Sequence, residues 1–596
     1  MPTLESLAHQ RFGDLSRAEI SVLSNAGIGQ LAICGPSDNL NDLANEPGTA
    51  DRWGADRWVR GELISWLCAD RQAKILVDPG GVQVLGAKIV GPVKLLSVPI
   101  QFPLVFACCE FGDEINLQSA GTRTLSFIQT HIQSIIADGA IVGGAFFLRH
   151  SRAALLQFSG AGIDGQFDCD RSAFNRLILD GAVVGVGVLL RHTTGQVKIS
   201  RARIGTDLDC DGASFTAPDA FSGPALDASG VNVEGSVFLR AGFRAIGSVQ
   251  LLGAHIGSNL DCTRGEFLGL SQTSNWSGEA LGADAVVVGG TVFLSDEFRA
   301  RGAVHFTSSQ IRGDFNCRRA TFETGLTIER ADVSGTFFWR EVTMGGAAGL
   351  DLLNTSVGSL SDDSVSWPSH QHVELHGFVY ERISLSSPRS AKERLNWLAR
   401  QKSFATQPYL QLAKVLRDEG HGGDAQKVLF EMESRRRREE DRGSIAHVVS
   451  FVYRNTLGYG YYPTPRAGFC LALLIAVGIL LFLGRYLGGS MVPTDKEAYS
   501  EYRLNHQLPP YYVRFHVSMY SLENTFPLVK LGQTDRWQPD PYQQGINAVD
   551  IKGILRVTRL FISARFLRFY QWTQIICGWF FAAMFVGGLA DIVRKN

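Results

Sequence analysis

The chain has 596 residues, and its 57 Lys and Arg against 58 Asp and Glu leave a formal net charge of -1, which excludes association with nucleic acid through overall charge. Its 64 Gly and 36 Phe beside 20 Pro indicate tight turns between buried strands. The 10 Cys contain no C-x-x-C pair, a usage typical of buried thiols in a reducing compartment.

The N-terminal segment begins with the polar stretch MPTLESLAHQRFGDLSRAEI and lacks the apolar core of a signal peptide. We therefore expect residues 1–80 to form a helical cap and the N-terminal part of the chain to lie in the cytosol.

A pattern that recurs about every 21 residues dominates the next part of the chain. Each copy has a central Ile or Val, an apolar residue four positions later and an apolar residue or Cys six positions later. The centres are Ile89, Val142, Ile163, Val184, Ile204, Val233, Ile256, Val288, Ile311 and Val333, with a degenerate copy around Phe111. Several copies carry a Phe eleven residues after the centre, at Phe174, Phe215, Phe267 and Phe322.

This pattern predicts a β-helix over residues 81–375, because side chains alternate inward and outward along short strands. The glycine that often follows two residues after the centre permits a turn, and stacked coils bury one continuous apolar column. Four cysteines occupy the same position of the repeat and are expected to pack in that column as a core ladder: Cys169, Cys210, Cys262 and Cys317. Two insertions, 216–230 and 269–282, are the candidate contact surfaces.

The repeat resembles the pentapeptide-repeat class of quadrilateral right-handed β-helices. The phrase RWVRGELISWLCAD, followed by GGVQVLGAKIVG, is similar to a group of bacterial membrane proteins with such solenoids, often labelled membrane-associated oxidoreductase. The resemblance implies a solenoid with a C-terminal membrane anchor, and its structural motifs carry over no catalytic residue.

After the solenoid, residues 376–450 show helical periodicity and predict a hairpin connector that caps the β-helix or joins it to the rest of the chain. Residues 451–596 then form the predicted membrane domain. Two uncharged, apolar stretches, 467–484 and 570–590, predict transmembrane helices over 467–487 and 570–592. Basic residues before the first stretch, with Arg594 and Lys595 after the second, favour the two termini inside the cell, whereas Arg556, Arg559, Arg565 and Arg568 lie at the other end and oppose that orientation.

Between these helices lies YSLENTFPLVKLG, in the place where a tetrameric cation channel has its pore helix and filter. This order resembles a channel pore module, although the Thr-x-Gly-Tyr/Phe-Gly filter of potassium pores is missing. The alternative is an amphipathic segment that lies on the membrane surface. The candidate pore residues are Ser521, Asn524, Thr525, Phe526, Pro527 and Lys530.

Other motifs give weaker evidence for a functional site. The stretch DLDCDG, 207–212, resembles the start of a calcium loop, but Pro218 occupies the twelfth position. His370, His372 and His376 have zinc-like spacing without a second cluster. No dinucleotide, Walker or catalytic-triad motif is present, so we expect no cofactor, no metal and no enzyme activity.

The sequence thus predicts a mainly β protein with helices, in the inner membrane of a bacterium, multi-pass, with its solenoid in the cytoplasm. The expected function is that of a scaffold, sensor or interaction protein. The alternative is an oligomeric ion channel or membrane-disrupting effector gated by the solenoid, and an oxidoreductase has the least support. The expected partners are the lipid bilayer and a protein or further copies of this chain, not nucleic acid.

Overall fold

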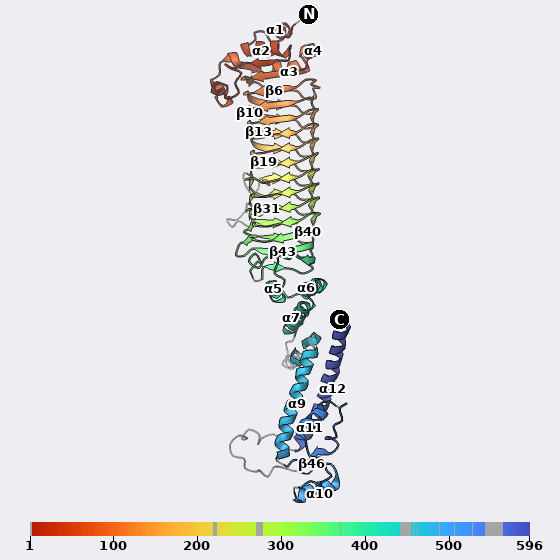
Figure 1. Cartoon of the computed structure of the whole chain (residues 1–596). Coiled ribbons are helices and arrows are strands. Elements are labelled where there is room, and N and C mark those ends of the chain that lie inside the picture. Colours follow the sequence, from red (N-terminus) through yellow and green to blue (C-terminus); the bar gives the residue numbers. More distant parts are fainter. Residues whose placement is uncertain are drawn as a thin grey trace. The chain divides into compact units, whose positions relative to one another are not determined.

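Short parallel strands stack into a β-solenoid of about 13 turns over residues 82–383, with a helical region after it (Figure 1). The computed structural model describes residues 3–217, 223–269, 278–369, 371–440, 454–456, 458–461, 463–487, 489–505, 507–526, 528–540, 542 and 564–595. The chain divides into two compact units, Met1–Ala425 and Gln426–Asn596. The predicted solenoid is confirmed, with about 22 residues per turn rather than 21.

The strands of the solenoid form two large sheets, and the register places the predicted centres from Val142 onward in one inward column of the first sheet. Val142 pairs with Ile163, Ile163 with Val184, and Val184 with Ile204. The residues four positions after these centres lie in the next strand of each turn: β12 (Phe146–Arg149), β15 (Phe167–Asp168), β18 (Val188–Leu189), β21 (Leu208–Asp209), β25 (Val237–Phe238), β29 (Leu260–Asp261), β33 (Val292–Phe293), β37 (Phe315–Asn316) and β40 (Asp332–Trp339).

Two predicted centres belong to the other sheet. Ile89 in β4 (Lys88–Val90) pairs with Phe111 in β7 (Glu110–Asn116), and that column continues through Ile132 and Ala153 to Phe174. Assigning Ile89 and Phe111 to the Val142 column was therefore wrong. The same apolar spacing occurs on both sides of a coil, so spacing alone does not say which side a residue occupies.

We call the part of each turn that contains one of the strands from β12 to β40 a rung. Neighbouring turns alternate between two kinds of rung. One kind places Leu inward between an apolar residue and, in most copies, Arg, as in Phe147-Leu148-Arg149 and Phe238-Leu239-Arg240. The other places Cys inward between acidic or polar residues, as in Asp168-Cys169-Asp170. The backbone bonds follow this order, since Cys169 N–H donates to Leu189 O and Leu190 N–H donates to Asp209 O. The true repeat is thus two turns long.

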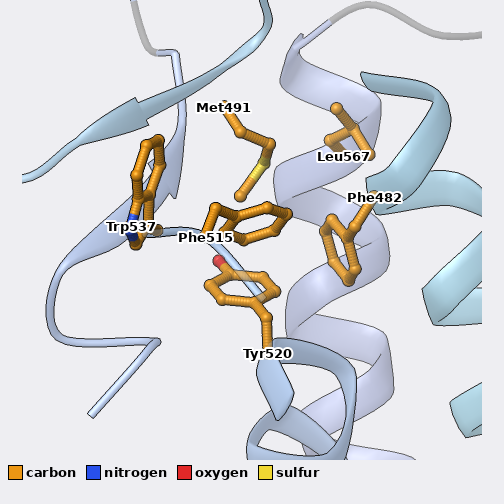
Figure 2. Packing of buried hydrophobic residues seen from close by; sticks show 6 residues of the cluster. All are labelled: Phe482, Met491, Phe515, Tyr520, Trp537 and Leu567. Carbon is orange, nitrogen blue, oxygen red and sulfur yellow. The ribbon is translucent and has the colours of Figure 1, made fainter. Parts of the chain in front are cut away.

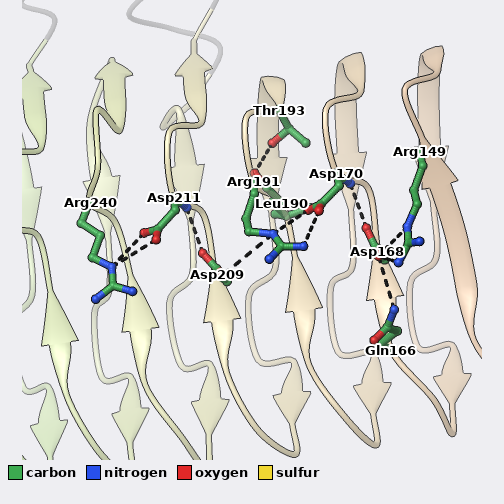
Figure 3. A network of polar contacts seen from close by, with 10 residues as sticks. All are labelled: Arg149, Gln166, Asp168, Asp170, Leu190, Arg191, Thr193, Asp209, Asp211 and Arg240. Carbon is green, nitrogen blue, oxygen red and sulfur yellow. Dashed lines mark hydrogen bonds and ion pairs between the residues drawn. The ribbon is translucent and has the colours of Figure 1, made fainter.

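The alternation explains the charges on the outer face of these rungs (Figure 3). Arg240 bonds Asp211 of the preceding turn at 3.1 Å and Asp261 of the following turn at 3.1 Å. Arg191 likewise lies between Asp170 and Asp209. Aspartates on successive rungs would stand about 4.8 Å apart and repel each other, whereas an Arg rung between them turns repulsion into a ladder of ion pairs.

Large and small side chains also alternate inside the second sheet. Phe215 pairs with Ala245, and Ala245 pairs in turn with Phe267. The ring of Phe243 fills the space beside Ala245 and lies 5.5 Å from Phe215 and 5.4 Å from Phe267. Phe and Ala thus alternate along this column, and rings from the neighbouring column fill the space beside each Ala.

The glycines of the repeat have two different roles. Gly160, three residues before the centre Ile163, has a φ of 64° and makes the left-handed corner of its turn. Gly165, two residues after that centre, permits close approach instead, since a β-carbon there would lie 2.8 Å from Gly144 O. The second glycine lies in the bend between two strands of its coil, as predicted, and the close approach between turns is a further requirement for glycine there.

Helices close the N-terminal end of the solenoid: α1 (Leu4–Phe12), α2 (Arg17–Ala26), α3 (Gly61–Ala69) and α4 (Ala73–Leu76). The first strand of the second sheet, β2 (Trp58–Arg60), exchanges hydrogen bonds with α2 and its N-cap residue. Ser16 Oγ donates to Trp58 O at 2.6 Å, and Glu19 accepts from Arg60 N–H at 3.1 Å. These side chains satisfy a strand edge that would otherwise pair with another chain.

The C-terminal end is closed by α5 (Ala391–Leu398) and α6 (Gln407–Asp418). The last strand, β45 (Val379–Ile383), continues the first sheet beyond the expected limit at residue 375 and pairs with β43 (Ser356–Asp362). Gln411 donates to Tyr380 O at 2.6 Å, while Glu419 accepts from Ile383 N–H at 3.0 Å. The helices after the solenoid thus cap its final rung.

Candidate functional site

The second unit contains two long helices with a short helix held between them. These are α9 (Pro463–Leu487), α11 (Val517–Thr525) and α12 (Ala564–Lys595), and α11 packs against both long helices. Among the residues that the structure describes, one helical segment, Arg466–Gly484, is long and apolar enough to cross a membrane, with a mean hydropathy of 2.7. The second predicted span falls within α12, and its crossing of a membrane stays a prediction.

An aromatic cluster anchors one end of this arrangement (Figure 2). Its buried members are Phe482, Met491, Phe515, Tyr520, Trp537 and Leu567. Met491 and Trp537 come from the antiparallel pair β46 (Met491–Pro493) and β47 (Trp537–Pro539), and Trp537 Nε1 donates to Val513 O at 3.0 Å. The cluster therefore ties the chain on both sides of α11 to the end of α9.

Two glycines make the space that α11 occupies. A β-carbon on Gly478 of α9 would lie 2.2 Å from Ser521 Oγ, and one on Gly578 of α12 would lie 2.2 Å from Thr525 O. Contacts this short cannot form, so a larger residue at Gly578 would displace the backbone of α11, and one at Gly478 would displace the side chains of Ser521 and Gln574. The sequence analysis did not single out either glycine.

A hydrogen-bond network joins the three helices at the same level. Gln574 of α12 is 0% exposed, and its Nε2 donates to Ser521 Oγ and Thr525 Oγ1, each at 2.9 Å. Both hydroxyls accept from Gln574 and donate to backbone carbonyls: Ser521 donates to Ile475 O at 2.9 Å, and Thr525 donates to Ser521 O at 2.9 Å. The network is therefore directional, and it leaves Gln574 Oε1 buried without a partner.

The depth that α11 reaches follows from these contacts. Its first residues lie beside the aromatic cluster, where Tyr520 packs 4.9 Å from Phe482. Its last residue, Thr525, lies against Gly578, one helical turn beyond Gln574. Gln574 in turn contacts Leu474 O at 3.3 Å, in the middle of the apolar segment Arg466–Gly484. The C-terminus of α11 thus ends near mid-height of that segment.

The chain then turns back and is clamped by a carboxylate. Glu523 is buried, and it accepts backbone N–H bonds from Gln533 at 2.8 Å and Thr534 at 3.0 Å. Gln533 returns the chain to the start of α11, because its side-chain oxygen accepts from His516 N–H at 3.0 Å. These bonds hold α11 and the residues around Gln533 together as one folded element.

The structure distributes the predicted pore residues over two environments. Ser521, Asn524 and Thr525 are buried and face α9 and α12, where Asn524 Oδ1 accepts from Gln571. Phe526 caps the C-terminus of α11 and Lys530 is exposed, whereas Pro527 lies outside the described residues. The sequence analysis did not identify Gln574, the buried hydrogen-bond partner of Ser521 and Thr525. The two glutamines in the apolar stretch YQWTQIICGW could have indicated a polar contact inside the helix bundle.

The structure places all four ladder cysteines inside the solenoid, but on every second rung. The leucines Leu190, Leu239 and Leu294 separate them, so successive sulfurs stand roughly 9.6 Å apart. That spacing is too long for a disulfide or a shared metal ion. Burial raises the pKa of each thiol well above its ordinary value. Among the described residues, no group of three or more His, Cys, Asp or Glu could hold a metal, while His370 lies outside them.

A hollow of about 530 Å³ opens on the second sheet of the solenoid. Phe111 and Ile132 lie at its buried floor, and Glu110, His131 and Arg152 line it in consecutive turns. His131 Nδ1 lies 3.4 Å from Glu110 Oε2. The two insertions predicted as contact surfaces lie elsewhere, and residues 218–222 and 270–277 within them fall outside the described residues.

Comparisons with known proteins identify no relative. No family model matches the chain, no curated protein matches it, and no solved structure matches it.

Proposed function

We propose that this protein is a membrane-anchored interaction protein whose solenoid binds a partner protein. The observation that carries this proposal is the hollow beside Glu110, His131 and Arg152 on a solenoid that is capped at both ends. Capping prevents the sheets from extending into a polymer, and the hollow offers groups of both charges above an apolar floor. A rigid arm with such a surface suits recognition of a protein segment.

In this proposal, α9 and α12 both cross the inner membrane of a bacterium, and the solenoid lies in the cytoplasm. The 32 residues of α12 extend about 48 Å, more than the hydrocarbon core requires. Apolar side chains of both helices face outward, including Phe469, Leu480, Trp572 and Ile576. Such surfaces are costly in water and suit lipid.

Site-specific photo-crosslinking in cells tests the binding surface. A benzoylphenylalanine at Gln133, in the hollow, is expected to give a discrete protein adduct. Gln310 is the matched control, because it is an exposed glutamine on a strand of the other sheet. Equal adducts at both positions, or none at Gln133, would remove the hollow as the binding surface.

A second candidate function, an oligomeric pore, is favoured by the depth of α11. A short helix that enters from one side and stops near mid-height is an arrangement that lines ion pathways. Ion flux from liposomes carrying the full chain tests it. Gly578→Val, which collides with Thr525 O, is expected to abolish flux, whereas Gly587→Val on the same helix meets nothing within 4 Å and should preserve it. Absence of flux for the wild-type chain would remove this candidate.

A further inference from the structure

Arg152 contributes an uncompensated positive charge to the hollow on the second sheet. It lies on β13 (Arg152–Gln157) and is exposed. Its side chain has no hydrogen bond or ion pair with any residue that the structure describes. The ladder explains why, because parallel pairing places His131 on the preceding turn and Ala173 on the following turn. Neither neighbour is an acid.

Another arginine in the same outward row has a carboxylate beside it. Arg244, at the start of β26 (Arg244–Ile246), pairs in the ladder with Glu266 of the following turn, and its Nε lies 3.3 Å from Glu266 Oε2. The turns between Arg152 and Arg244 present only small side chains in this row: Ala173, Thr194 and Ser214. The guanidinium group of Arg152 therefore borders an open stretch of the hollow.

The acid of the hollow does not compensate Arg152. Among the lining residues, all of which the structure describes, Glu110 is the one carboxylate. His131 lies between Glu110 and Arg152 in the ladder, and its Nδ1 is 3.4 Å from Glu110 Oε2. Two turns of strand spacing, roughly 9.6 Å, separate the backbones of Glu110 and Arg152. The other exposed polar residues of the lining are uncharged: Gln133, Asn175 and Thr194. The charge that the hollow lacks is negative.

We infer that the protein segment bound in this hollow is acidic and places a carboxylate on Arg152. This inference rests on the proposed function and names the chemistry of its partner. A guanidinium group binds one carboxylate through two parallel hydrogen bonds. Phosphorylated segments are bound by clusters of arginines, whereas this lining contains a single one. The amides of Gln133 and Asn175 are available for the backbone of the same segment.

Photo-crosslinking of the full chain from benzoylphenylalanine at Gln133, combined with changes at Arg152, tests the inference. Arg152→Glu is expected to lower the yield of the protein adduct roughly tenfold, because it sets like charges against each other. Arg152→Lys keeps the charge but loses the two parallel bonds, so an intermediate yield is expected. Arg203→Glu is the matched control, since Arg203 is an exposed arginine on β20 (Arg203–Ile204) of the other sheet, and the yield should not change.

Mass spectrometry of the digested adduct then reads the attached partner segment. An Asp or Glu is expected beside the attachment site. Replacing that acid by Lys in the partner should lower the yield with the wild-type chain and restore it with Arg152→Glu. This exchange of charges is a result that a merely structural role of Arg152 would not produce.

The outcomes separate this inference from the proposed function. An adduct at Gln133 that Arg152→Glu leaves unchanged overturns the acidic partner and keeps the hollow as the binding surface. An attachment site that is basic, neutral or phosphorylated, or a lower yield that the exchanged charge does not restore, also overturns the acidic partner alone. Absence of any adduct at Gln133 in the wild-type chain overturns the binding surface, and the inference falls with it.

Discussion

Gly478 of α9 faces Ser521 of α11 so closely that a single added methyl group would overlap the serine hydroxyl. This contact positions a polar half-helix inside an otherwise apolar pair of helices.

We expect Gly478→Ala to destabilise the second unit by about 1 to 3 kcal/mol, the usual result of overpacking. Unfolding of the detergent-solubilised protein, followed by tryptophan fluorescence of the cluster around Trp537, measures the change. Gly484→Ala, at an open position of the same helix, is the control and should leave the transition unchanged or raise it slightly. Equal effects of the two variants would show that α11 does not pack against Gly478.

The two-turn repeat predicts a disulfide that the wild type cannot form. Leu190 lies between Cys169 and Cys210, so Leu190→Cys would place sulfurs on adjacent rungs, with α-carbons about 4.8 Å apart. Diamide treatment followed by denaturing alkylation should show two fewer free thiols by intact mass. Leu326→Cys should lose none, because its ladder neighbours are Val304 and Leu350. A wild-type bond between Cys169 and Cys210 would contradict the register.

The C-terminal cap contains a buried ion pair whose loss should be severe. Both nitrogens of the Arg394 fork donate to Asp362 at 2.7 Å, and the two side chains are 0% and 2% exposed. Asp362→Asn leaves the arginine charge without its partner and should cost about 3 to 5 kcal/mol in the free energy of unfolding. Glu323→Gln breaks the exposed pair with Arg301 and should cost under about 1 kcal/mol. Denaturant melts of the full chain compare the two.

The N-terminal cap should weaken in acid. Burial raises the pKa of Glu19, but hydrogen bonds from Arg60 and Ser16 outweigh it and hold the pKa below the ordinary value of 4.5. The folded state therefore binds fewer protons than the unfolded state, so this stabilisation is present above pH 4.5 and decreases as pH falls through the folded pKa. Hydrogen exchange of α2 between pH 6 and pH 3 should show the loss, and Glu19→Gln should flatten that dependence. An unchanged profile in the variant would assign the acid sensitivity to other groups.

If the protein forms a pore, its charge selectivity should follow Lys530. The channels that the sequence order resembles conduct cations, but the charge exposed after α11 is positive. A ring of lysines favours anions, so the reversal potential in a KCl gradient should have the sign of chloride selectivity. Lys530→Glu should invert that sign, while Lys496→Glu on α10 (Lys496–Asn505) should leave it unchanged. Cation selectivity in the wild type would exclude Lys530 from the pathway.

The pairing of residues across turns explains which expectations failed. Val142, Ile163 and Val184 share a column because their spacing stays near one coil length, and this could be read directly. The assignment of Ile89 failed because each coil presents similar apolar spacings on two sides, and only hydrogen bonding between turns distinguishes them. The alternation of Leu190 with Cys210 was visible in the letters, but it has meaning only once adjacent rungs are known to pair.

Short-range periodicity by itself determined the solenoid, the helical region after it and the apolar span of α9, because alternation and hydropathy are properties of neighbouring residues. The tertiary structure decided where the polar side chains of α11 point. Ser521 and Thr525 face Gln574 across about 50 residues of chain, and Gly478 and Gly578 admit them. Such a site depends on close approach between distant segments, which no local pattern encodes.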